Sequence, residues 1–372
     1  MIYFDNASTT RIKPKESLDA FLDYVNNIGV SPGRGCYTLG ITASRMLYQA
    51  RKTVANYFGI KDPNVVFTKN STEAINLFFQ GFLKKGDHVV ITCYEHNAVF
   101  RPLNYLKSNG IIEYSIISRE DLDKDPEYIV RKYIKENTVL FVTTLASNVT
   151  GRIIFNPMLI EKFKEKHVDI FVDSSQGAGK IEINMEPNKI DYVAFTGHKD
   201  LMALDGVGGL CSINALDIKP LIQGGTGIHG EEYTNPKIYP EGLESGTLNM
   251  PAIWSLKASL DYLKENKIKI NKYEEELTNY LISRLKSIKK VEMYDEGYPR
   301  VSTISINIKG FSSNQIVSIL DKNNICVRGG IHCSILTHKT LSTESVGAVR
   351  ISMNYNNTKE EIDYLISVIE RI

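Results

Sequence analysis

The stretch DYVAFTGHKDLMALDGVGGL, residues 191–210, contains the pattern that decides the fold. It starts with an apolar run typical of a buried strand, continues through Gly197, His198 and Lys199, and ends in a glycine-rich segment. In open α/β sheets, reactive groups gather just beyond the carboxyl ends of the strands. Lys199 therefore lies where a lysine with a lowered pKa could form a Schiff base. An ordinary surface lysine is the alternative at such a position.

Short apolar runs alternate with helical patterns around this stretch. Several runs show no polar alternation, as expected for strands covered on both faces of a sheet. Helical patterns such as STEAINLFFQGFLKK and PMLIEKFKEK separate them. This alternation predicts an α/β large domain with a mostly parallel, doubly wound, seven-stranded sheet. The seven runs, between residues 64 and 213, are NVVFT, DHVVIT, IEYSII, VLFVTTL, VDIFVD, DYVAFT and GVGGLCSI.

The pattern changes near residue 249. Two helical patterns, at 251–264 and 270–288, precede shorter strands in RVSTISINI, NICVRGG and GAVRISM, and further helices are expected at 312–322 and 358–371. Strands of this kind with antiparallel pairings predict a smaller α+β domain. We therefore expect a large domain over 15–255, and a small domain formed by 1–14 and 256–372 that carries a cysteine loop.

Composition limits the classes of partner. The chain has 372 residues, and its 44 basic and 43 acidic side chains give a formal net charge of +1. That balance provides no broad basic field for nucleic acid or an anionic membrane. No apolar run has the length of a signal peptide or approaches the roughly 18 residues of a membrane span. The sequence predicts a cytoplasmic protein with neither nucleic-acid nor membrane partners.

Polar residues also follow other predicted strands. Asp173 ends VDIFVD, and Gln176 follows three positions later. A carboxylate can keep the pyridine nitrogen of pyridoxal 5′-phosphate (PLP) protonated, which makes the ring a better electron sink, and Gln176 could donate to the ring's phenolic oxygen. A helix N-cap is the alternative role for Asp173.

Three further segments supply weaker signals. TKNSTEAINL resembles a capping box, and a helix N-terminus there would bind phosphate together with the hydroxyls of Ser71 and Thr72. His96, in CYEHNAV, could stack on a flat cofactor or be a structural histidine. Asn148, in TLASNVTG, could equally be a turn residue. The order of these features, each directly after an apolar strand, predicts a PLP enzyme.

The chain resembles the class V, fold-type I PLP-dependent aminotransferase superfamily, specifically its cysteine desulfurases and the selenocysteine lyase-like members of that branch. The resemblance covers nearly the whole chain. It rests on the segments FDNASTT, NSTEAINL, EHNAV, ASNVTG, FVDSSQGAG, FTGHK, ESGTLNMP, RGGIHC and VRISMNYNNT.

The resemblance implies a role for each matched position. Lys199 would form the Schiff base, and Arg350 would pair with the substrate carboxylate, although without the resemblance a strand-edge surface arginine would be favoured. A Gly-Thr pair from the partner subunit of a homodimer would complete the phosphate site. The implied catalytic residues are Lys199, Cys333 and His96. The implied cofactor-binding residues are Ser71, Thr72, His96, Asn148, Asp173, Gln176, Thr196, His198, Lys199, Gly246 and Thr247. The implied substrate-binding residues are Asn6, Asn148, Arg328 and Arg350.

Cys333 decides between reactions. The five cysteines are scattered and lack CxxC spacing, so neither disulfides nor a metal site are indicated. Only Cys333 lies in a glycine-rich segment typical of an exposed, mobile thiol, where positive charge on Arg328 or His332 could favour the thiolate.

The resemblance aligns Cys333 with a sulfur-accepting cysteine. It implies a PLP-dependent cysteine desulfurase that converts L-cysteine to L-alanine and leaves a persulfide on the enzyme, with a possible sulfur-acceptor protein as partner. Selenocysteine lyase and a small-substrate class V aminotransferase are the alternatives. One departure from the family stands out, because Asp200 and the residues to Asp205 replace the usual Gly-Pro pair and bring acidic groups near Lys199.

Overall fold

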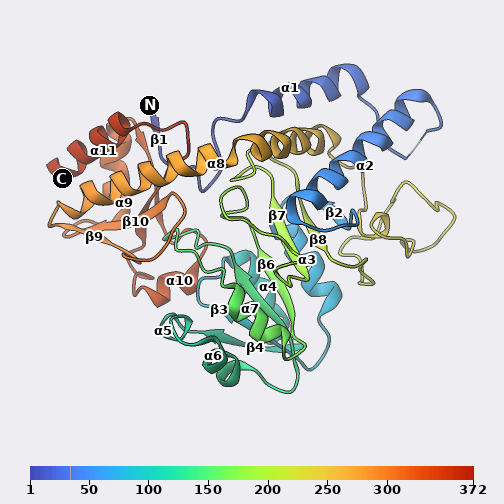
Figure 1. Cartoon of the computed structure of the whole chain (residues 1–372), viewed down its shortest axis with the longest axis horizontal. Helices are drawn as coiled ribbons and strands as arrows, with labels where there is room; N and C mark the ends of the chain where they lie inside the picture. Colours follow the sequence, from blue (N-terminus) through green and yellow to red (C-terminus); the bar gives the residue numbers. More distant parts are fainter. Residues whose placement is uncertain (34) are drawn as a thin grey trace.

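A seven-stranded sheet forms the centre of the larger part of the molecule (Figure 1). The computed structural model describes residues 1–33 and 35–372. The strand order is β2-β8-β7-β6-β5-β3-β4, and β8 runs antiparallel to both of its neighbours while the other pairs are parallel. The prediction of a mostly parallel seven-stranded sheet is confirmed. The strands are β2 (Val65–Thr68), β3 (Asp87–Thr92), β4 (Ile112–Ile117), β5 (Thr138–Thr144), β6 (Asp169–Asp173), β7 (Tyr192–Thr196) and β8 (Gly208–Ser212).

Apolar side chains cover both faces of this sheet. Along β2, Val65 and Phe67 belong to one buried cluster, whereas Val66 belongs to another on the opposite face. Residues of α2, α7 and α8 pack into the first cluster, and residues of α3 and α4 pack into the second. Continuous apolar runs are therefore the pattern that this sheet requires. The helices are α2 (Thr38–Phe58), α3 (Ser71–Phe82), α4 (Asn97–Ser108), α5 (Arg119–Leu122), α6 (Pro126–Tyr133) and α7 (Pro157–Lys164).

Two smaller sheets lie in the other part of the molecule. A four-stranded antiparallel sheet has the order β12-β13-β10-β9, and β1 pairs with β11 in parallel. The segment NICVRGG, expected as one strand, forms two strands that pair in different sheets. The strands are β1 (Ile2–Tyr3), β9 (Val291–Met293), β10 (Thr303–Ile308), β11 (Ile325–Cys326), β12 (Arg328–Gly330) and β13 (Ala348–Ser352); the helices are α9 (Ser313–Lys322), α10 (Ile335–Thr340) and α11 (Lys359–Arg371).

One long helix joins the two parts (Figure 1). The prediction of two helices was wrong, because α8 (Met250–Lys286) is continuous over 37 residues. No glycine or proline lies between 264 and 270, so nothing in that segment breaks the backbone pattern. Early residues such as Leu256 pack in the core of the large sheet, whereas Leu281 packs with the smaller sheets. The helix crosses the domain boundary expected at residue 255. Beside it lies α1 (Lys15–Asp23).

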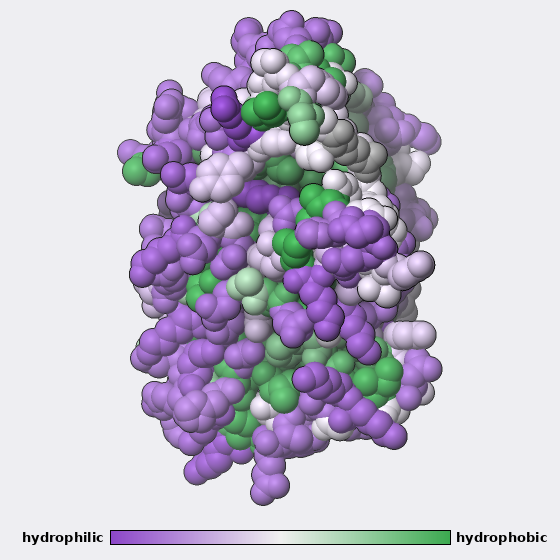
Figure 2. Space-filling view, turned by 90° about the vertical axis from the view of Figure 1, so that its right-hand side faces the viewer, coloured by the Kyte–Doolittle hydropathy of each residue, from purple (hydrophilic) through white to green (hydrophobic). Residues whose placement is uncertain are grey.

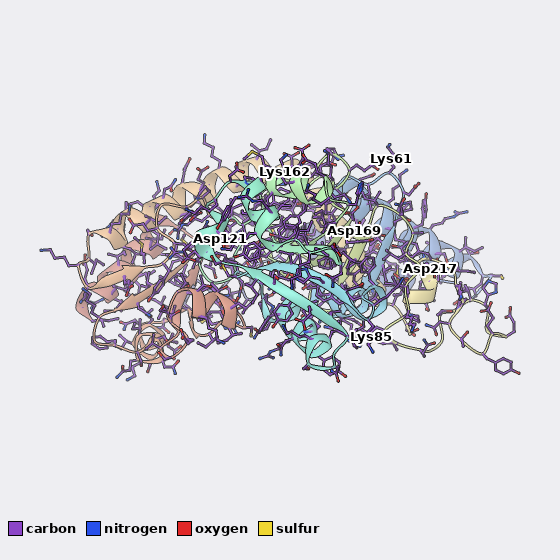
Figure 3. The ribbon with its side chains drawn as sticks, turned by 90° about the horizontal axis from the view of Figure 1, so that it is seen from below. Lys61, Lys85, Asp121, Lys162, Asp169 and Asp217 are labelled. Carbon is purple, nitrogen blue, oxygen red and sulfur yellow. The ribbon has the colours of Figure 1, made fainter. Side chains whose placement is uncertain are left out.

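The surface is mixed in charge. Figure 2 shows one end of the molecule, where a mostly hydrophilic surface is interrupted by small hydrophobic groups. In the part of the chain that the structure describes, no helix is both long enough and apolar enough to cross a bilayer. Acidic and basic residues are interspersed around the large sheet (Figure 3), as the labelled residues Lys61, Lys85, Asp121, Lys162, Asp169 and Asp217 illustrate.

Candidate active site

The ends of three parallel strands bring the candidate residues to one edge of the large sheet. In the register of β5, β6 and β7, Asp173 pairs with Thr144 on one side and with Ala194 on the other. Asn148 and Lys199 follow β5 and β7 within a few residues. The strand-by-strand order seen in the sequence therefore becomes a spatial cluster at the carboxyl edge.

Asp173 is held by hydrogen bonds within the site. Its buried carboxylate accepts from the backbone N–H of Ser175 at 2.9 Å and from the Ser175 hydroxyl at 2.5 Å. That hydroxyl is 2.8 Å from Ser71 Oγ, and since its one proton points to Asp173, Ser71 is the donor in the second contact. Gln176 donates one amide N–H to the Ala7 carbonyl at 2.8 Å, which leaves its second N–H for a ligand.

The start of α3 offers backbone donors. Asn70 is the N-cap, and its side chain accepts from the Glu73 N–H at 3.0 Å. The N–H groups of Ser71 and Thr72 precede the first intrahelical hydrogen bonds and point out of the helix end. Such an end attracts phosphate.

Lys199 has the environment of a nucleophilic amine. It is half-buried, and the Thr10 hydroxyl donates to its carbonyl oxygen at 2.9 Å. Burial lowers the pKa of Lys199; the negative charge of Asp173 opposes this effect, while the positive charge of Arg350 adds to it. A lowered pKa increases the fraction of neutral amine, which is the form that attacks a carbonyl carbon.

Asp200 is paired elsewhere and does not hold Lys199 in an ion pair. Its buried carboxylate accepts from the Gly177 N–H and lies 3.3 Å from Lys180 Nζ. Lys180 Nζ is also 2.8 Å from Glu274 of α8, and both carboxylates raise the pKa of Lys180 against the effect of burial. The acidic residue that departs from the family pattern is therefore part of a buried Asp200–Lys180–Glu274 cluster.

His96 is neutral and oriented. It is the N-cap of α4, where its Nδ1 accepts from the Ala98 N–H at 3.0 Å, so that Nε2 carries the proton. Burial lowers the pKa of His96 to about 3, and the positive charge of Lys199 contributes to the decrease. The preceding Glu95 is completely buried, which raises the pKa of its carboxyl to about 8.

A polar region near the end of β7 has unused hydrogen-bonding capacity. Thr196 Oγ1 is buried and lacks a hydrogen-bond partner among the described residues. His198 is half-buried, with Nδ1 3.0 Å from Asp205. Together with Asn70 and Thr247, His198 lines a cavity of about 560 Å³. Gly246, beside Thr247, adopts a φ of 96°, which favours glycine.

Arg350 lies on β13 and is buried, unlike the surface arginine of the alternative interpretation. One Nη donates to Asp5 Oδ1 and Ser8 Oγ, each at 2.8 Å, and the other donates to the Asn148 carbonyl at 2.9 Å. The resemblance implies that Asn6 binds substrate. In the structure its amide N–H donates to the main-chain carbonyl of Ser352, which attaches the N-terminal segment to β13.

The thiol of Cys333 is exposed, as expected. Arg328 Nη2 lies 3.6 Å from its sulfur, and Arg328 Nη1 lies 3.3 Å from Ser8 Oγ. His332 is buried, and burial lowers its pKa well below the ordinary value. Of the two residues that could supply positive charge, Arg328 rather than His332 is therefore the cation beside the sulfur. The Asn97 N–H donates to the Cys333 carbonyl at 2.8 Å, so the main chain beside the thiol is attached to the start of α4.

The residues of this site come from nearly the whole length of the chain, from Asp5 to Arg350. The match to a known family covers the same length. Residues 2–365 match the sequence model of the family described as "Aminotransferase class-V". The chain belongs to this family.

Class V relatives share its full length. A probable cysteine desulfurase of Methanothermobacter thermautotrophicus is 33% identical over 379 residues, which covers 100% of this chain and 94% of that protein. A cysteine desulfurase of Wigglesworthia glossinidia brevipalpis is 29% identical, with 100% and 92% covered. The apo structure of the cysteine desulfurase from Thermococcus onnurineus NA1 superposes with a TM-score of 0.90 at 29% identity, covering 100% of this chain and 94% of that one.

Three residues of this class V site received no role from sequence reasoning. Ser175 connects Asp173 to Ser71, and Asp5 and Ser8 contact Arg350. All three lie inside segments that carry the family resemblance, FVDSSQGAG and FDNASTT. The signal was therefore present, but it did not reveal which polar residues of each segment make the contacts.

Proposed function

We propose that this class V enzyme is a PLP-dependent cysteine desulfurase that converts L-cysteine to L-alanine and takes the sulfur onto Cys333 as a persulfide. One observation carries the proposal. The exposed Cys333 thiol lies beside Arg328, on a loop whose main chain is hydrogen-bonded to the start of α4 and to the loop that follows β5. Aminotransfer requires no such thiol.

The residues at the sheet edge fit PLP. Asp173 would bind the protonated ring nitrogen, Gln176 the phenolic oxygen, and His96 would stack on the ring. The unpartnered hydroxyl of Thr196 and the N-terminus of α3 suit the phosphate. Lys199, with its lowered pKa, would hold the cofactor covalently. When bound, PLP withdraws electrons from the substrate Cα and so makes its proton removable.

The side chains would act on the substrate in sequence. Arg350 would bind the α-carboxylate, exchanging part of its contact with Asp5, and the freed amine of Lys199 would move the Cα proton. The Cys333 thiolate would then attack the substrate sulfur. An S–S bond forms as the Cβ–S bond breaks, and the electron pair stays with the carbon skeleton, which is protonated to give alanine.

A homodimer and a cytoplasmic location belong to the same proposal. Gly246 and Thr247 would complete the phosphate site of the partner subunit. Exposed apolar side chains in the two segments that line a cavity next to Gly246 support a subunit contact there. They are Leu39, Ile41 and Tyr48 of α2, and Ile222, Tyr233 and Ile238 of the loop before α8. The free cysteines suit a reducing compartment, and a sulfur-acceptor protein would remove the persulfide.

The test is the product profile with L-cysteine and a thiol reductant. Alanine and sulfide should form in equal amounts with the wild type, and Cys333→Ala should abolish both. Cys36→Ala, which changes another exposed thiol, is the matched control and should keep full activity. Full desulfurase activity in Cys333→Ala would show that the persulfide mechanism is wrong. Preference for selenocysteine in the same assay would instead indicate the lyase.

A further inference from the structure

The backbone at Cys333 adopts an unfavourable conformation. His332 and Cys333 have φ angles of 51° and 55°, in the left-handed region that side chains other than glycine seldom occupy. Two consecutive residues of this kind persist only where surrounding contacts hold them. Such strain concentrates at functional sites, and here it fixes the direction in which the Cys333 side chain leaves the backbone.

Hydrogen bonds from the large sheet hold one side of this turn. Asn148 Nδ2 donates to the His332 carbonyl at 2.7 Å, and the Asn97 N–H donates to the Cys333 carbonyl at 2.8 Å. Ser334 Oγ donates to the Glu95 carbonyl at 3.1 Å. The main-chain carbonyls of both strained residues therefore have partners from outside the loop.

A pair of buried histidines holds the other side. His332 Nε2 is 3.1 Å from the Arg328 carbonyl, which can only accept, so Nε2 carries a proton. In the neutral ring Nδ1 is then an acceptor, and it lies 3.2 Å from His338 Nε2, which must donate. His338 Nδ1 in turn accepts from the Thr343 hydroxyl at 2.8 Å. Burial supports the neutral state of both rings, since it lowers the pKa of His338 to about 4.

These contacts form one directed chain from Thr343 through His338 and His332 to the Arg328 carbonyl. Arg328 lies at the end of the chain, and its guanidinium contacts the Cys333 sulfur. The chain therefore links the residue that supplies the positive charge to the residue that precedes the thiol. His338, on α10, is completely buried, and the hydrogen bonds of its ring go to His332 and Thr343, not to the sulfur.

We propose that His338 is a positioning residue for sulfur transfer: by donating from Nε2 to His332, it holds the strained turn that places the Cys333 sulfur beside Arg328. The proposal rests on the proposed function of Cys333 as the sulfur acceptor. It assigns a mechanistic task to a buried histidine that contacts neither the thiol nor any residue of the sheet edge.

The test compares two amide substitutions in the PLP-loaded enzyme. In His338→Gln the side-chain NH2 lies near the position of Nε2 and can still donate to His332. In His338→Asn the amide is one methylene shorter and ends near the position of Nδ1. The rate of alanine formation, the KM for cysteine, the cofactor absorbance, and hydrogen–deuterium exchange of the 328–334 peptide are measured for both.

We expect His338→Asn to lower kcat on the order of tenfold, with KM and absorbance unchanged and faster exchange over 328–334, because small misplacements of reacting groups are costly. His338→Gln should restore most of kcat and the slow exchange. His167→Asn, at an exposed histidine, is the matched control. Thr343→Val removes the hydroxyl that donates to His338 Nδ1, so the proton of His338 is no longer held on Nε2. It should therefore also lower kcat and speed exchange over 328–334, and it takes the place of His338→Asn if that variant does not fold.

Equal kcat and exchange in the wild type and His338→Asn would overturn the proposal, as would equal losses in the Gln and Asn variants. These outcomes are distinct from failure of the proposed function. If the wild type forms no alanine from cysteine, the desulfurase assignment fails, while exchange over 328–334 still decides whether His338 holds the turn.

Discussion

Arg350 and Asp5, which lie 345 positions apart in the sequence, form an ion pair with 2.8 Å between Nη2 and Oδ1. The arginine side chain is 1% exposed and the aspartate side chain 21% exposed. The cation is thus oriented before any ligand binds, and its partner is the more accessible of the two. In the proposed function, a substrate carboxylate would replace one oxygen of Asp5 on a guanidinium that is already oriented.

The first prediction concerns Arg350→Lys. Lysine keeps the charge but cannot make two parallel hydrogen bonds to a carboxylate. Losing one charge-assisted hydrogen bond, worth about 1.5–3 kcal/mol, should raise the KM for cysteine roughly tenfold or more. Steady-state kinetics measure the change, with Arg371→Lys near the C-terminus as control. An unchanged KM would remove Arg350 from the substrate site.

Lys199→Ala is predicted to abolish covalent cofactor binding. The purified variant should lack the visible absorption of the covalently bound cofactor, and borohydride reduction should leave no cofactor on the peptide that contains residue 199. Lys189→Ala, at an exposed lysine, should behave as the wild type in both measurements. A modified peptide from elsewhere in the Lys199→Ala chain would mean that another lysine is the attachment point.

The buried charge cluster leads to a stability prediction. Lys180→Met leaves Asp200 and Glu274 buried without their cation, and breaking a buried pair in this way costs about 3–5 kcal/mol. Denaturant unfolding should therefore show a large decrease in the free energy of unfolding of Lys180→Met. Lys189→Met, which removes the exposed pair with Glu161, should cost less than about 1 kcal/mol. Similar losses in the two variants would contradict the importance of burial.

Acid should destabilise the fold through its buried histidines. His88 bonds to Thr138 and Ser115, and burial lowers its pKa to about 4. The unfolded chain, with a histidine pKa near 6.5, then binds more protons below that pH. This contribution to stability is complete above pH 6.5 and is lost as the pH falls toward 4.

The loss for one such group is on the order of 2 kcal/mol between pH 7 and pH 5. Denaturant unfolding at both pH values measures it, and His88→Gln should show a smaller difference between the two than the wild type. The same difference in both proteins would mean that His88 titrates normally in the fold.

The large sheet was predictable because its signal is local. The centre of a strand such as β6, Ile170 to Val172, is continuously apolar because both faces are covered, and Asp173 marks its end. The same logic located Lys199 and Asn148. The contacts of these residues were less predictable, because Ser175 reaches Ser71 across 104 positions and a motif does not reveal such pairing.

Long-range pairing also explains the errors. NICVRGG reads as one strand, yet β11 pairs with β1 at the N-terminus while β12 pairs with β13. His332 is adjacent to Cys333 in the sequence and was one of two residues that could supply positive charge beside the thiol. Its neutrality depends on burial and on His338, which lies in a helix that the local pattern did not predict.

The continuity of α8 restricts how the molecule can move. A helix of this length is a rod of about 55 Å, and its two halves are embedded in different cores. Glu274, near the middle of α8, also pairs with Lys180. Lys180 in turn pairs with Asp200, the residue that follows Lys199. A hinge at residue 255 would have to break helical hydrogen bonds within packed surroundings. One continuous helix therefore opposes a change in the spacing between the large sheet and the smaller sheets, and with it a change in the spacing between Lys199 and Cys333.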